Sequence, residues 1–154
     1  MVRLAELPKV EREHLLGKAC DPFDSKPWAE GPPLAQRRVA LVTTAGLHRA
    51  SDQAFSMFDL SYRVIPGNVR AEDLTMTHSS VHFDRTGFRV DVNLVLPIDR
   101  LRELEQEGVI GSVADFHYSL MGAGWLPHQI EPTIAELARF LRKDEVDAVC
   151  LVPV

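Results

Sequence analysis

The stretch RVALVTT, residues 38–44, decides the fold of this chain. It is rich in β-branched residues, has charged residues at its start and ends at the turn Ala45-Gly46. This pattern is typical of a buried central strand in a parallel sheet. Three other apolar runs are predicted to be strands of the same sheet: residues 62–65, 110–118 and 147–152.

Helical segments alternate with these strands. Residues 97–108 have a proline at the first helical turn and a glycine at the end, which predicts a short amphipathic helix. Residues 127–142 carry apolar side chains at helical spacing after the Gly-rich turn 119–124, which predicts a longer helix. Residues 89–94 are expected to hold a short strand or hairpin.

The alternation of strands and helices predicts an α/β fold: an open, mainly parallel sheet with flanking helices, Rossmann- or flavodoxin-like and truncated after its last strand. Residues 37–154 are expected to form a single α/β domain, since 154 residues, 45% of them hydrophobic, can bury one core. Residues 1–36 hold five prolines and one amphipathic stretch, residues 10–18, and are predicted to form a Pro-rich N-terminal arm.

Composition excludes several classes of partner. A net charge of −5 argues against non-specific nucleic-acid binding, which needs a Lys/Arg-rich surface. The apolar runs are far shorter than the roughly 20 residues of a membrane helix, and the N-terminus lacks an apolar signal core. We therefore expect a cytoplasmic protein that binds neither nucleic acid nor membrane. Cys20 and Cys150 are not expected to form a disulfide there.

Several segments together carry a family resemblance. They are residues 39–48 (VALVTTAGLH), 61–66 (SYRVIP), 93–104 (NLVLPIDRLREL), 108–111 (GVIG), 117–119 (HYS) and 146–149 (VDAV). Their order and spacing resemble the selenoprotein B family of glycine, sarcosine, betaine and D-proline reductases, in its short D-proline-reductase-like branch. The resemblance extends over residues 38–154.

The resemblance implies a nucleophile outside the sequence. In the family, the strand that resembles residues 146–154 is followed by selenocysteine or cysteine, so the nucleophile is expected after Val154. We hypothesise that the sequence is the portion before an in-frame UGA codon; a truncation without such a codon is the alternative.

The implied reaction is reductive cleavage of a C–N bond. A selenolate or thiolate attacks the carbon next to a carboxylate and displaces an amine, and a dithiol then reduces the enzyme. The implied substrate is a small amino-acid-like or betaine-like molecule. The family also implies a pyruvoyl group on a separate partner subunit. No pyruvoyl precursor is recognisable here, so no cofactor is expected in this chain.

The residues left in the chain would form the cradle of the site, because the carboxyl ends of parallel strands share one edge of a sheet. His48 or His117 is a candidate to orient or stabilise the nucleophile as an imidazolium ion. The predicted substrate-binding residues near the strand ends are Thr43, Thr44, Gly46, Ser119 and Gly122. For each of them the alternative is structural: a side-chain cap or a glycine that permits a turn.

Residues 77–85 (THSSVHFDR) have two interpretations. We favour a loop over the rim of the sheet, with His78 or Asp84 lining the site and Arg85 as a carboxylate partner. The weaker alternative is a metal site formed by His78, His82 and Asp84. It is disfavoured because the intervening residues do not favour a helix, and a lone HxxxH lacks the glutamate of zinc proteases.

Two classes of function therefore stay open. The first is the scaffold of a selenocysteine- or cysteine-dependent reductase subunit. The second is a non-catalytic α/β binding or oligomerisation module that lacks the nucleophile. A homo-oligomer is expected in either case, because residues 149–154 would leave an apolar edge bare.

Overall fold

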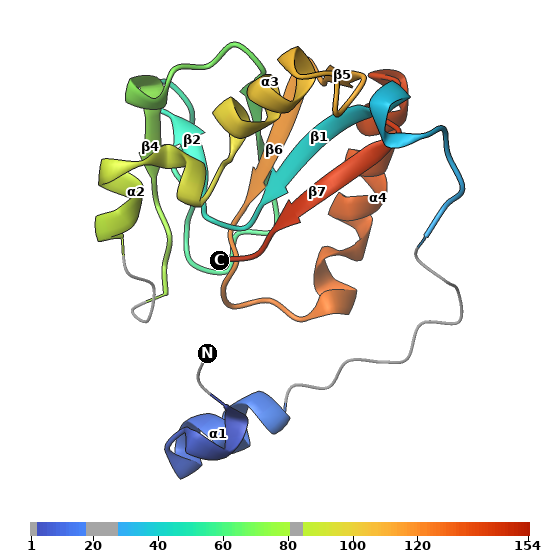
Figure 1. The fold of residues 1–154 in the computed structure, drawn as a ribbon. Helices are drawn as coiled ribbons and strands as arrows, with labels where there is room; N and C mark the ends of the chain where they lie inside the picture. Colours follow the sequence, from blue (N-terminus) through green and yellow to red (C-terminus); the bar gives the residue numbers. More distant parts are fainter. Residues whose placement is uncertain (1–2, 18–27, 81–84) are drawn as a thin grey trace.

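The computed structural model describes residues 3–17, 28–80 and 85–154 (Figure 1). Its α-helices are α1 (Lys9–Leu16), α2 (Thr86–Val90), α3 (Ile98–Gln106) and α4 (Pro127–Lys143). Its strands are β1 (Arg38–Thr43), β2 (Leu47–Arg49), β3 (Tyr62–Pro66), β4 (Leu74–Met76), β5 (Ser112–Val113), β6 (Phe116–Leu120) and β7 (Ala148–Val152). Short 3-10 helices are Leu4–Glu6, Leu34–Gln36, Ala71–Asp73 and Val92–Leu94.

The strand predicted to be central, β1, is central in the sheet. β7 runs parallel to it along one edge, from the pair Val39–Ala148 to the pair Thr43–Val152. β5 and β6 share its other edge, both parallel, and β3 lies antiparallel beyond β6. The predicted α/β fold with a mainly parallel sheet is confirmed. The structure departs from a simple doubly wound sheet, because β3 is antiparallel and β2 pairs with β4 in a separate two-stranded ribbon.

Both faces of the sheet carry apolar cores because β1 is apolar from residue 39 to residue 42. Leu41 points to the face that packs with Leu47, Ile65 and Leu96, whereas Val42 points to the face covered by α4. The second core consists of Val42, Tyr118, Leu120, Ile130 and Leu137. α4 begins with a proline, whose fixed φ suits a first helical turn, and its buried residues Ile130 and Leu137 lie two turns apart.

The amino end of β1 is held by Arg38, which forms ion pairs with Asp144 and Asp115. Arg38 Nη2 lies 2.6 Å from Asp144 Oδ1, and Arg38 Nε donates to the main-chain carbonyl of Asp144 at 2.7 Å. The other carboxylate oxygen of Asp144 accepts from the N–H groups of Asp115 and Phe116 at 3.1 and 3.3 Å. This single carboxylate therefore joins the start of β1, the β5–β6 turn and the end of α4.

Two predicted elements are wrong in detail. Residues 89–94 form the end of α2 and a 3-10 turn instead of a strand, because Asp91 accepts from the N–H of Asn93 and Asn93 accepts from the N–H of Asp99. Residues 110–118 split into β5 and β6, where Asp144 binds the turn between them. Among the described residues, the helices are all too short or too polar to cross a membrane.

Candidate functional site

The carboxyl ends of β1 and β7 meet at Thr44. The N–H of Val154 donates to Thr44 Oγ1 at 2.9 Å, and the Thr44 hydroxyl lies 3.3 Å from the Val154 carbonyl oxygen, to which it donates. The main-chain N–H of Thr44 donates to the carbonyl of Val152 at 3.1 Å. Three hydrogen bonds therefore hold residues 152–154 against the end of β1.

Gly122, just beyond β6, closes the third side of this junction. A Cβ atom on Gly122 would lie 2.7 Å from the Thr44 carbonyl oxygen and 2.9 Å from that of Val154. Only glycine permits this approach without a backbone shift. Thr44, Gly122 and Val154 thus come together, as expected for the ends of neighbouring parallel strands.

Gly46 joins the same junction to the loop that follows β4. Its φ of +65° favours glycine, and a Cβ there would lie 2.7 Å from the Thr77 carbonyl oxygen and 3.4 Å from the Cα of His78. The N–H of Thr77 donates to the Gly46 carbonyl at 2.9 Å. Gly46 is therefore required by close packing between the end of β1 and this loop.

His78 lies buried in that loop, only 4% exposed. Its Nδ1 accepts from the N–H of Ser80 at 3.2 Å, and the Arg85 guanidinium donates to the carbonyls of His78 and Ser80. Burial, together with the positive charge of Arg85, lowers the pKa of His78, so the ring is neutral near pH 7. The N–H of Ser79 donates to the Met121 sulfur at 3.4 Å, which ties the loop to the end of β6.

We define the rim as Thr44, Gly46, His78, Arg85, Gly122 and Val154. His82 and Asp84, the other two residues of the weak metal alternative, lie outside the described residues. Within residues 3–17, 28–80 and 85–154, no three His, Cys, Asp or Glu side chains gather as a metal site would need.

Thr43 and Ser119 are fully buried and serve the backbone. Thr43 Oγ1 accepts from the N–H of Ala45 at 3.2 Å, and Ser119 Oγ accepts from the N–H of Leu47 at 2.7 Å. These contacts favour the structural alternative for both side chains. What they cap is the turn between β1 and β2 rather than a helix.

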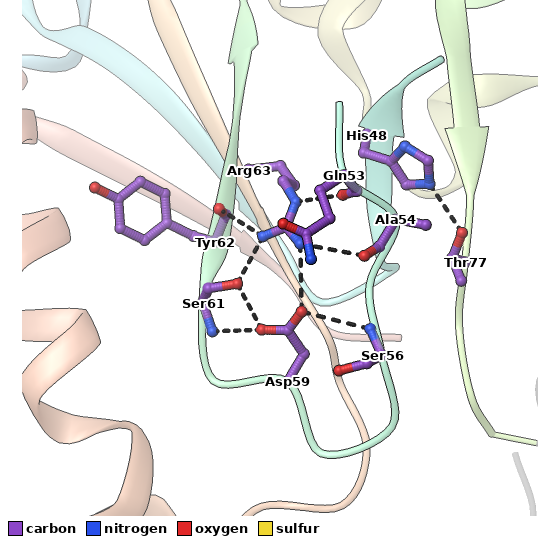
Figure 2. A network of polar contacts seen from close by, with 9 residues as sticks. All are labelled: His48, Gln53, Ala54, Ser56, Asp59, Ser61, Tyr62, Arg63 and Thr77. Carbon is purple, nitrogen blue, oxygen red and sulfur yellow. Dashed lines mark hydrogen bonds and ion pairs between the residues drawn. The ribbon is translucent and has the colours of Figure 1, made fainter. Parts of the chain in front are cut away.

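His48 lies within β2, and both of its ring nitrogens have partners, of which Figure 2 shows Thr77. Nδ1 lies 2.8 Å from the Arg49 carbonyl and must donate to it, so Nε2 accepts from the Thr77 hydroxyl at 2.8 Å. Its ring packs edge-on against Phe55. His48 therefore links β2 to the loop after β4, and no lone pair or proton remains for a substrate.

A network around Arg63 holds the loop between β2 and β3 beside the rim (Figure 2). Arg63 donates to the Gln53 carbonyl at 2.7 Å, pairs with Asp59 at 3.3 Å and lies over the Phe55 ring at 4.2 Å. The loop holds Phe58 at a φ of +62°, with its ring where a Cβ of Gly124 would be. Sequence analysis missed this network, because a loop has no periodicity that pairs Asp59 with Arg63.

His117 is the second residue of β6, so it lies near the amino end of that strand and away from the carboxyl ends that form the rim, and it is fully buried. Its Nδ1 accepts from the N–H of Leu41 at 3.0 Å, so the neutral ring carries its proton on Nε2, for which the described residues provide no acceptor. Burial, with a smaller contribution from Arg102, lowers the pKa of His117 to about 4. The ring therefore serves the β1–β6 pairing, as a neutral acceptor.

His117 is expected to make the fold sensitive to acid. The folded state keeps the ring neutral down to about pH 4, whereas the unfolded chain binds a proton near pH 6.5, so stability falls as the pH drops between these values. Between pH 8 and pH 5 the loss is about 2 kcal/mol. Urea unfolding of wild type and His117→Gln checks this, since glutamine keeps an acceptor for Leu41 but does not titrate. An identical pH profile in both proteins would contradict the assignment.

Some hollows lined by described residues lie elsewhere on the molecule. One of about 570 Å³ is lined by Gly67, Val69, Arg70, Asp99 and Arg102. Because β3 is antiparallel to β6, Gly67 follows β3 next to the start of β6, at the opposite end of the sheet from Val154. The rim is a junction of strand ends, away from this hollow.

Comparisons with known proteins agree with the resemblance. Residues 28–154 match the family model of glycine/sarcosine/betaine reductase selenoprotein B. The chain is 38% identical to D-proline reductase subunit gamma of Acetoanaerobium sticklandii over 120 residues, 77% of this chain and 49% of that protein. It is 36% identical to glycine reductase complex component B subunit gamma of Symbiobacterium thermophilum over 141 residues, 84% of this chain and 31% of that protein.

A third relative is sarcosine reductase complex component B subunit beta of Peptoclostridium acidaminophilum, 33% identical over 77% of this chain and 28% of that protein. The chain spans about half the length, or less, of these curated relatives. No solved structure matches it significantly. With a family match that extends over residues 28–154, the chain belongs to the glycine/sarcosine/betaine reductase selenoprotein B family.

Proposed function

We propose that this chain forms the scaffold of a reductase subunit that cleaves C–N bonds, and that its rim presents a selenocysteine or cysteine supplied from outside residues 1–154. The observation that carries the proposal is the position of Val154. Its N–H is bound to Thr44 and its carbonyl approaches Gly122, so a segment joined there would meet the rim directly.

The proposed chemistry balances in two steps. A selenolate or thiolate forms a bond to the carbon next to the substrate carboxylate, and the C–N bond breaks with its electron pair going to the amine, which takes up a proton. A second thiol then attacks the chalcogen; the bond to carbon breaks, the carbon takes up a proton and a selenenyl-sulfide or disulfide forms. A dithiol supplies the two electrons that reduce it.

The rim residues have distinct proposed roles. Thr44 and Gly122 position the segment that bears the nucleophile. Arg85 provides a positive charge for a substrate carboxylate, and the main-chain carbonyls of His78 and Ser80 hold its guanidinium in place. A pyruvoyl group on a separate subunit would hold the substrate amine; the relatives are named as subunits and complex components, which supports a multi-subunit assembly.

Activity of a continued form tests this proposal. The chain continued with cysteine at position 155 and the sequence that follows in D-proline reductase subunit gamma is incubated with dithiothreitol, a pyruvoyl-bearing partner and glycine, sarcosine, betaine or D-proline. We expect dithiol-dependent amine release, or ring opening of D-proline, that is absent when serine replaces the added cysteine. Equal turnover by the serine form would overturn the proposal.

One observation favours the alternative function, a non-catalytic α/β binding or oligomerisation module. β7 leaves Val149, Cys150 and Leu151 exposed, as a strand in a binding or oligomerisation module would. A stable assembly through this strand, without turnover in the continued form, would favour the non-catalytic module.

A further inference from the structure

β7 is an edge strand with the sequence of an inner one. Its residues, AVCLV, include no charge and no proline. Among the described residues it pairs only with β1, along one side. An edge strand with these properties is a template for further pairing, and natural proteins rarely leave one unguarded. Figure 1 shows β7 at the outer edge of the sheet.

Both faces of β7 carry exposed side chains, although Ala148 and Val152 at its ends pack against the core on the Leu41 side. Leu151 is 71% exposed and Val149 39%, and by register with Val42 and Ala40 both point to the α4 side. Cys150 pairs with Leu41 and points to the opposite face, where it is also exposed. A parallel strand is normally covered on both faces, so helices are expected on each side of β7.

At the other edge of the same sheet, β3 has features that block pairing with a further strand. β3 carries Arg63, whose guanidinium binds the carbonyls of Gln53 and Ala54 in the adjoining loop (Figure 2). It ends in Pro66, which has no N–H to offer another strand. β7 itself contains no charged residue and no proline that would block pairing, and among the described residues no loop covers its free edge.

We infer that β7 is an inner strand of the complete family fold. The segment that pairs with its free edge is a further strand with a covering helix, from the half of D-proline reductase subunit gamma that this chain does not span. Pairing of β7 with a second copy is less suitable, because it would leave the Cys150 face of both copies without a helix: α3 packs against β5, on the far side of β1. The inference rests on family membership and not on the proposed chemistry.

Amide hydrogen exchange tests the inference in two proteins: this chain of residues 1–154 and full-length D-proline reductase subunit gamma of Acetoanaerobium sticklandii. We expect the outward-facing amides of residues 148–152 to exchange rapidly here, and the aligned amides of the relative to exchange at least tenfold more slowly. The amides of β1 serve as the protected reference in both. Fast exchange of these amides in the relative would overturn the inference. Protection of residues 148–152 in this chain that rises with protein concentration would also overturn it, because β7 would then pair with a second copy.

A lysine substitution gives a second, independent measurement. Leu151→Lys in this chain should leave the thermal midpoint unchanged, as should the control Val90→Lys, because both side chains are mostly exposed. Lysine at the position of the relative aligned with Leu151 should abolish soluble folded protein or lower its midpoint by more than 5 °C, since a charge would be buried there. Tolerance of that lysine would contradict the inference. Neither measurement uses enzyme activity. Failure of the inference about β7 is therefore distinguishable from failure of the proposed reaction.

Discussion

Replacement of Asp144 by alanine is expected to lower the free energy of unfolding by about 3 kcal/mol. The carboxylate is 13% exposed, receives the Arg38 guanidinium and two main-chain N–H groups, and links three segments of the fold. Its removal leaves these donors without their acceptor and Arg38 with a weaker partner. Urea unfolding followed by tryptophan fluorescence measures the loss.

Asp115→Ala is the matched control, because Asp115 binds the same guanidinium at 3.0 Å but is 76% exposed. A solvated ion pair contributes at most about 1 kcal/mol, so this variant should stay close to wild type. Equal losses in the two variants would show that the burial of Asp144 is not what makes it important.

Gly46→Ala is expected to cost about 3 kcal/mol. An L-residue at a φ of +65° costs roughly 1 kcal/mol, and the added Cβ would lie 2.7 Å from the Thr77 carbonyl oxygen, which overpacks the junction by roughly 2 kcal/mol more. The loop at residues 77–80 must move, and with it His78. Unfolding experiments give the energy, and amide chemical shifts of this loop report the displacement.

The variant Gly108→Ala distinguishes the cost of the positive φ from the cost of close packing. Its φ is +71°, but a Cβ there would meet no atom within 4 Å. Gly108→Ala should therefore cost only the backbone contribution, roughly 1 kcal/mol. If Gly46→Ala and Gly108→Ala prove equally costly, the close packing of Gly46 against Thr77 is not a source of stability.

The sequence was sufficient to predict elements whose cause is local. β1, α3 and α4 follow from β-branched runs, terminal proline and glycine, and helical periodicity, all of which lie within the element itself. The strand expected at residues 89–94 failed because Asn93 binds the start of α3, and the strand at 110–118 was split by Asp144, 29 residues after Asp115. Neither kind of contact leaves a periodic signal: the Asn93 contact is a single polar bond between segments six residues apart, and the Asp144 contact joins distant parts of the chain.

The same distinction holds at the site. Thr44, Gly46 and Gly122 were predicted from the rule that parallel strands end at one edge of a sheet. The structure brings these residues together at the carboxyl ends of β1 and β6. His48 and His117 were assigned to the same edge by that rule, but His48 lies within β2 and His117 lies near the amino end of β6. The partner of a histidine ring lies across the sheet, at Thr77 for His48 and at Leu41 for His117, and sequence does not reveal it.

The most direct test of the rim is amide exchange of Val154, measured by NMR in wild type, Thr44→Ser and Thr44→Val. The hydrogen bond from Val154 to Thr44 Oγ1, at 2.9 Å, predicts that this amide is protected in wild type and in the serine variant, which keeps the hydroxyl. The valine variant, which loses the acceptor while retaining its shape, should exchange freely. A freely exchanging Val154 amide in wild type would contradict the account, because the end of β7 would then not be held at the rim.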